Sequence, residues 1–172
     1  MHRILCLIAV VLLPGLAGQA AAQERTQLAP STSAAEEISV TVGGKVDGKK
    51  ISGNGAGTCS HAADASIHGV SASLWTVQYA AAKDGSLKQL SLTLWRPKDE
   101  GPDQLSLTID AKSGSYRIET GKPGDAKGEG LVTILPSGPG GRLEISGKDS
   151  SGKPIQITID CSAFGGVQPE GN

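Results

Sequence analysis

The strongest constraint on this chain is an alternation of apolar and polar residues that recurs from residue 38 to residue 161. In the last such segment, Ile155, Ile157 and Ile159 are separated by polar residues. Strict alternation places one face of a strand against a core and the other in water, which is typical of antiparallel sheets. The segments with this pattern, or a shorter form of it, are 38–42, 74–79, 90–94, 104–109, 116–118, 131–135, 143–145 and 155–159.

Turn signals separate these segments and complete the prediction of fold class. Asp47-Gly48 supplies the positive φ angles of a tight hairpin. A glycine-rich segment, 53–57, is interpreted as a strand with a close backbone approach, and residues 62–70 as a loop or a single turn. About nine short strands predict an all-β domain, either an antiparallel β-sandwich or an open barrel. Further turns are expected at 84–85, 113–114 and 151–152, with longer loops at 97–102 and 136–141.

The cysteines predict one disulfide between Cys59 and Cys161. Cys6 lies in an apolar segment that is expected to be removed, so an even pair remains. The sequence has no C-x-x-C motif and no second cysteine pair. A redox pair or a metal-thiolate site is therefore not favoured. Cys161 continues the isoleucine face and Cys59 is expected to end the glycine-rich strand, so the bridge would tie the last strand to an early one.

The N-terminal segment predicts export. Arg3 precedes the apolar run 4–13, and Ala20-Ala21-Ala22 fits a cleavage site, so residues 1–22 are interpreted as a signal peptide. No stretch reaches the length of a transmembrane helix. A periplasmic or secreted protein is expected. Its predicted parts are a flexible leader over 23–36, the β domain over 37–164 and a disordered tail over 165–172.

The charge balance narrows the class of partner. The chain has 16 basic and 17 acidic residues, and this lack of basic excess argues against a nucleic-acid partner. Because no cofactor-binding motif is found, no cofactor is expected. A glycine-rich phosphate loop at 53–57 would need a following helix and a lysine next to Ser or Thr, and the sequence provides neither.

His61, Asp64 and His68 are the candidate metal ligands. Two imidazoles and a carboxylate can hold zinc or iron, and on a helix their spacing would bring them to one face. The alternative is that His61 and Asp64 are turn residues after Cys59. Ser60 adds a hydroxyl to this group, but no G-x-S-x-G motif supports a hydrolase triad.

Trp95 and Arg96 are the candidate ligand-binding or partner-binding residues. Trp75 shares its face with Val77 and is predicted to be core, whereas Trp95 falls on the face opposite Leu94. An exposed Trp95 beside Arg96 could stack on a sugar ring or meet a protein partner.

In layout, the chain resembles the mycobacterial lipoprotein-antigen family of small exported β proteins, which have one early and one terminal cysteine. The similarity covers residues 38–161 and is carried by three segments and by the position of Cys59. The chain departs from the family in lacking the acylated cysteine and in carrying two central tryptophans. The resemblance implies an exported, disulfide-bonded β domain and provides no catalytic residues. The three segments are SVTVGGK (39–45), GRLEISG (141–147) and IQITIDC (155–161).

These observations predict an exported, non-enzymatic binding protein of the cell envelope or extracellular space. Its partner would be a protein or glycan of the envelope, and an inhibitor or immunity-type role is one form of this function. A metal-dependent hydrolase using His61, Asp64 and His68 is the first alternative. A structural envelope component is the second, and the sequence leaves the oligomeric state open.

Overall fold

The computed structural model describes residues 38–67, 69–83, 85–99, 101–121 and 126–167, and these contain nine strands and no helix. The predicted signal peptide and leader lie outside the described residues. No helix among the described residues is long and apolar enough to cross a membrane. The strands are β1 (Ile38–Val46), β2 (Lys49–Ile67), β3 (Val70–Ala80), β4 (Leu87–Pro97), β5 (Gln104–Ala111), β6 (Gly114–Glu119), β7 (Glu129–Ser137), β8 (Gly140–Lys148) and β9 (Pro154–Cys161).

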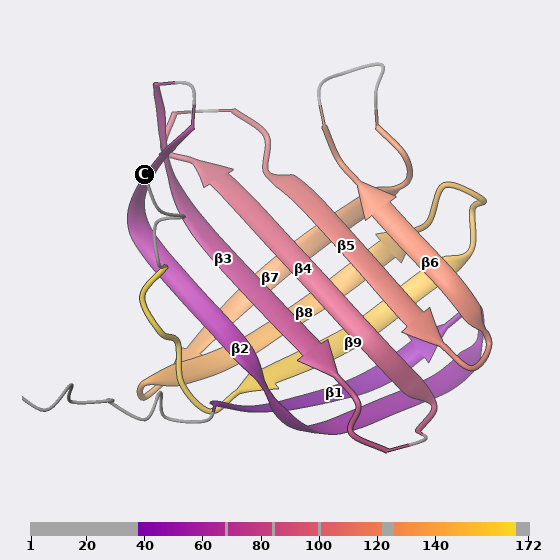
Figure 1. Cartoon of the computed structure of the whole chain (residues 1–172). Coiled ribbons are helices and arrows are strands. Elements are labelled where there is room, and N and C mark those ends of the chain that lie inside the picture. The colour runs from indigo at the N-terminus through magenta and orange to yellow at the C-terminus, as the bar shows by residue number, and fades with distance from the viewer. Residues whose placement is uncertain (1–37, 68, 84, 100, 122–125, 168–172) are drawn as a thin grey trace, which may run out of the picture. The chain divides into compact units, whose positions relative to one another are not determined.

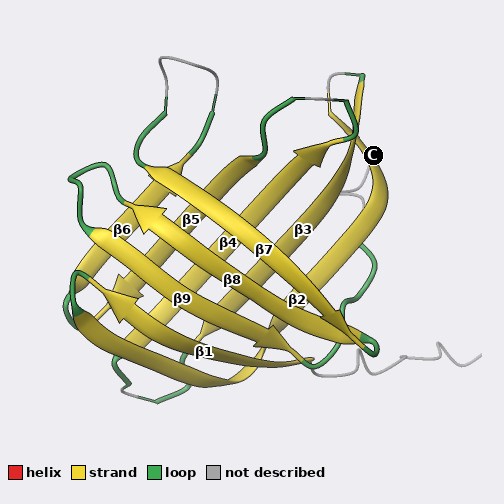
Figure 2. Cartoon of the chain, turned by 180° about the vertical axis from the view of Figure 1, so that it is seen from behind, coloured by secondary structure: helices red, strands yellow, loops and turns green. Residues whose placement is uncertain are grey.

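The nine strands form one antiparallel sheet in the order β6-β5-β4-β3-β2-β1-β9-β8-β7. The sheet curls into a half-barrel, so that β7, β8 and β9 cross behind β3, β4 and β5 in Figure 1 and in front of them in the reverse view of Figure 2. The prediction of an all-β domain with about nine strands is confirmed. Of the two predicted forms, a single curled sheet corresponds to the open barrel.

The core lies inside the curl and follows the alternation seen in the sequence. In β9, Ile155, Ile157 and Ile159 are buried, and the residues between them are exposed or half-buried. The same alternation holds in β5 and in most of β4. Each strand therefore contributes one apolar face to a shared core. The largest fully buried side chains are Tyr116, Ile51, Leu87, Leu90, Leu92, Leu94, Leu107, Ile109, Ile118, Leu143, Ile145 and Ile155.

Two of the turns test the sequence prediction directly. Asp47 and Gly48 join β1 to β2 with φ angles of 53° and 72°, which confirms the predicted tight hairpin. The predicted longer loop at 136–141 is wrong, because β7 runs to Ser137 and β8 begins at Gly140. Gly138, with a φ of 56°, makes this tight turn possible.

Strand β2 is longer than predicted. It continues through Cys59 to Ile67, so the interpretation of residues 62–70 as a loop or turn is wrong. Pairing with β3 explains the difference, because Ala62 lies across from Leu74, and the ladder of paired residues overrides the low β-propensity of alanine. A β-bulge interrupts this pairing between Ala62 and Ala65.

The glycines of β2 allow close packing on the core side, as predicted for 53–57. A Cβ atom at Gly53 would lie 2.7 to 2.9 Å from atoms of the Tyr79 ring. At Gly57 it would lie 2.6 Å from the backbone oxygen of Gln78 and 2.7 Å from Val40 Cγ2. The glycines of β2 thus leave room for the Tyr79 ring and for Val40, and they allow a close approach to the backbone of β3.

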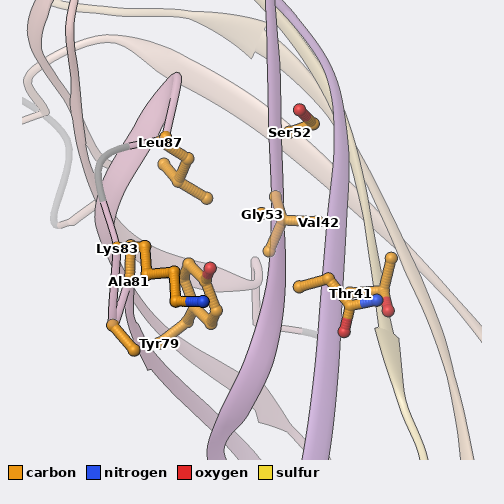
Figure 3. A pocket seen from close by; sticks show the side chains of 11 residues that line it. Thr41, Val42, Ser52, Gly53, Tyr79, Ala81, Lys83 and Leu87 are labelled. Atoms are coloured by element: carbon orange, nitrogen blue, oxygen red, sulfur yellow. The ribbon is translucent and has the colours of Figure 1, made fainter.

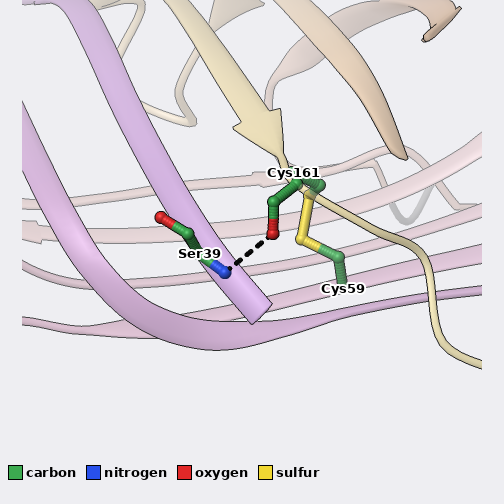
Figure 4. The surroundings of a disulfide bond; sticks show 4 residues. Ser39, Cys59 and Cys161 are labelled. Atoms are coloured by element: carbon green, nitrogen blue, oxygen red, sulfur yellow. Dashed lines mark hydrogen bonds between the residues drawn. A yellow bond between two sulfur atoms is a disulfide. The ribbon is translucent and has the colours of Figure 1, made fainter. Parts of the chain in front are cut away.

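The predicted disulfide is present. Cys59 in β2 and Cys161 at the end of β9 are joined beside the start of β1, with a Cα–Cα distance of 6.2 Å (Figure 4). The backbone N–H of Ser39 donates to the Ser162 hydroxyl next to the bridge, at 2.9 Å. Gly165, predicted to begin the tail, bonds to β2 through Cys59 O and His61 N. The last strand and Gly165 are therefore fixed to β2.

Candidate functional site

The structure separates His61 from Asp64, the two candidate metal ligands that it describes. His61 faces the core side of β2, where it pairs with Trp75. Asp64 lies in the bulge, with its side chain 80% exposed and paired with Lys98. His68 lies outside the described residues. Among the described residues, no three His, Cys, Asp or Glu side chains form a group that could hold a metal.

His61, Trp75 and Arg96 instead form a stack at one end of the half-barrel. The rings of His61 and Trp75 are nearly parallel, with centroids 4.5 Å apart, and Phe164 meets His61 edge-on. The guanidinium carbon of Arg96 lies 5.6 Å from the centre of the Trp75 ring, within range of a cation–π contact. His61 Nε2 is buried and has no hydrogen-bond partner in the described part of the chain. His61 is therefore a packed side chain in this structure.

Arg96, a candidate binding residue, connects distant parts of the sheet. Its guanidinium forms a bidentate ion pair with Asp103, with an Nη2–Oδ2 distance of 2.7 Å, and also donates to Val132 O at 3.2 Å. Hydrogen bonding to Asp103 raises the pKa of Arg96, and burial opposes this in part. Because Val132 belongs to β7, at the far end of the strand order, Arg96 helps to close the curl.

We expect Asp103→Ala to lower the free energy of unfolding by about 1 kcal/mol, because Arg96 would lose its partner at a half-exposed site. Asp160→Ala is the control. It breaks a similar ion pair with Arg142 that joins only the neighbouring strands β8 and β9, so we expect a smaller loss. Urea unfolding of both variants measures the difference. An equal loss would contradict a larger contribution from the Arg96–Asp103 pair than from the Arg142–Asp160 pair.

Trp95 is buried, with 6% of its surface exposed, so the exposed tryptophan that a stacking or partner-binding role would require is not present. It does lie on the face opposite the main core, as the alternation predicted, and is not part of the core cluster. Leu74 and Gln104 flank Trp95 in the two neighbouring strands, and its place on the outward face did not by itself determine its exposure. Trp95 therefore offers little surface to a partner.

A hollow of about 580 Å³ lies beside the first half of β2. Strand β2 pairs with β3 only from Gly57 onward, and this leaves a gap next to the turn that follows β3. Tyr79 and Lys83 extend toward Val42 and Gly53 across the hollow (Figure 3). Sequence reasoning did not identify this hollow, because it arises where two strands part.

The outward surface of the sheet contains an uncharged area that lies between strands with charged outward residues. On β1, β9, β8 and β7 the outward positions carry charges of both signs, with ion pairs between Arg142 and Asp160 and between Lys148 and Glu129. On β2 to β5, two adjacent rows of four residues carry none, and we call these eight residues the neutral face. The rows are Ser60, Thr76, Thr93 and Ser106, and Thr58, Gln78, Ser91 and Thr108. The next row, Ala62, Leu74, Trp95 and Gln104, is also uncharged. On β6 the two rows of the neutral face end at Glu119 and Arg117, which form an ion pair with each other.

The side chains of the neutral face reach solvent, because each residue is exposed or half-buried. Within the described part of the chain, one side-chain hydrogen bond joins members of the face, from Gln78 Nε2 to Ser91 Oγ at 2.8 Å. Hydroxyl and amide groups both donate and accept, so the face offers many hydrogen-bonding groups to a ligand. The neutral face is therefore the candidate functional site.

Comparison with known proteins adds no relative from which a function could be inferred. A scan against protein-family models and searches of curated proteins and of solved structures found no match.

Proposed function

We propose that this chain is an exported, non-enzymatic binding protein of the cell envelope or extracellular space, and that its ligand lies on the neutral face. The observation that carries the proposal is the absence of charge from two rows across four strands, although β6 and the strands β7 to β9 all carry charged outward residues. Surfaces that meet only water are usually interspersed with charged residues, which favour solubility. A neutral, hydrogen-bonding face is suited to contact with a ligand.

The disulfide supports export, because such bonds persist in oxidising compartments. The signal-peptide pattern of residues 1–22 supports the same compartment.

A binding function is favoured over metal-dependent hydrolysis because the side chains of His61 and Asp64 make separate contacts with other residues. A hydrolase would need His61, Asp64 and His68 around one ion. His61 stacks on Trp75, and Asp64 pairs with Lys98 in the bulge of β2.

The proposal predicts that the domain co-sediments with washed envelopes of the cells that produce it. Thr93→Lys should weaken this binding about tenfold or more, because it places a strongly hydrated charge in the middle of the neutral face. Thr158→Lys is the matched control, since Thr158 is also half-buried and outward, but lies on β9 between Gly43 and Glu144. We expect this variant to bind like the wild type. No sedimentation of the wild type, or equal loss in both variants, would contradict the proposal.

A further inference from the structure

We propose, on the basis of the function proposed above, that the ligand of the neutral face is a neutral polysaccharide of the cell envelope. Sugar hydroxyls are donors and acceptors without charge, and the seven Ser and Thr hydroxyls and one Gln amide of the face match them in both respects. Binding would bury no charged side chain of the face, so the large cost of removing a charge from water is avoided.

The shape of the face points to a polymer. Its two rows cross four strands, a width of about 14 Å at the usual strand spacing. The hollows around Tyr79 and around Gly43 are lined by residues outside the face. A single hydrogen bond contributes only about 0.5 to 1.5 kcal/mol net. An extended chain that lies across several side chains can add such contacts, whereas a short sugar can reach few of them.

The composition of the face argues against other polymers. Central residues of protein interfaces are enriched in aromatic side chains, Met and Arg, and the neutral face contains none of these. It also has no Lys or Arg to neutralise phosphates, which nucleic-acid binding requires. An anionic polysaccharide would likewise find no cation on this face, and the cation at its border, Arg117, is paired with Glu119. A neutral polysaccharide is the envelope polymer that remains.

The test uses washed envelopes treated in two ways before the domain is added. Sodium periodate cleaves the vicinal diols of sugars, and proteinase K, removed before binding, digests envelope proteins. We expect periodate to abolish co-sedimentation of the wild type and proteinase K to leave it unchanged. Binding should also be equal at about 0.05 and 0.5 M NaCl, because salt screens charge interactions and none is involved. Thr93→Lys should bind about tenfold less than Thr158→Lys to envelopes treated with proteinase K.

The outcomes separate this inference from the function on which it rests. Binding that is lost with proteinase K and kept with periodate would overturn the polysaccharide and identify a protein partner, while the binding function would stand. Binding that falls steeply with salt would overturn neutrality of the ligand. Failure of untreated envelopes to bind the wild type would contradict the proposed function itself.

Discussion

Reducing the disulfide between Cys59 and Cys161 is expected to lower the free energy of unfolding by about 4.7 kcal/mol. The bond closes a loop with a sequence separation of 102, and the chain-entropy model gives a loop of about 100 residues this value. The bond also joins two strands on either side of β1, so the released ends would have to be brought together by the sheet alone. This is the largest effect of a single bond that we expect in the chain.

Urea unfolding of the wild type with and without a thiol reductant measures this effect with every side chain unchanged. The double variant C59A/C161A is the control, because reductant should leave its unfolding curve where it is. A change of less than about 1 kcal/mol on reduction of the wild type would show that the bridge adds little constraint to the unfolded chain.

Gly57→Ala is expected to destabilise the domain by about 1 to 3 kcal/mol, through overpacking. The added Cβ would lie 2.6 Å from the backbone oxygen of Gln78 and 2.7 Å from Val40 Cγ2. The carbonyl belongs to β3, which pairs with β2 and β4, so the backbone cannot retreat without disturbing two neighbouring strands. The clash would therefore have to be relieved by shifts of core side chains such as Val40.

Gly55→Ala is the matched control in the same strand. Its Cβ would meet Tyr79 Cε2 at 3.8 Å, an ordinary van der Waals contact. Replacing glycine where alanine fits reduces the freedom of the unfolded chain and can add about 0.4 to 1 kcal/mol of stability. We expect the two variants to differ clearly in their urea midpoints. Equal midpoints would contradict the close approach of β2 to β3.

Much of the fold could be predicted because the information is local. Alternation in 155–159 identifies both a strand and its buried face, and Asp47-Gly48 alone specifies a hairpin. Residues 62–67 could not be predicted in this way, because alanine has little preference for a strand. They are strand residues because β3 provides pairing partners. Such pairing depends on the register of two strands and leaves no periodic signal in one of them.

The candidate site was harder to predict than the fold. His61 and Asp64 looked like a group because they are close in sequence, yet strand geometry and a bulge send them to different surroundings. Alternation places Arg96 on the same face as Leu94, which is the core side, and this was a signal against its use as an exposed binding residue. The neutral face depends on rows across four strands, so it becomes visible only when the register is known.

The central claim is that the neutral face is the binding surface, and the ratio of envelope affinities of Thr93→Lys and Thr158→Lys tests it most directly. Both variants place a lysine at an outward, half-buried threonine in a paired strand, so the comparison isolates the face. Free energies of unfolding within about 0.5 kcal/mol of the wild type, usual for surface substitutions, establish that both variants are folded. We expect Thr93→Lys to bind about tenfold less tightly than Thr158→Lys. Equal affinities in two folded variants would contradict the claim.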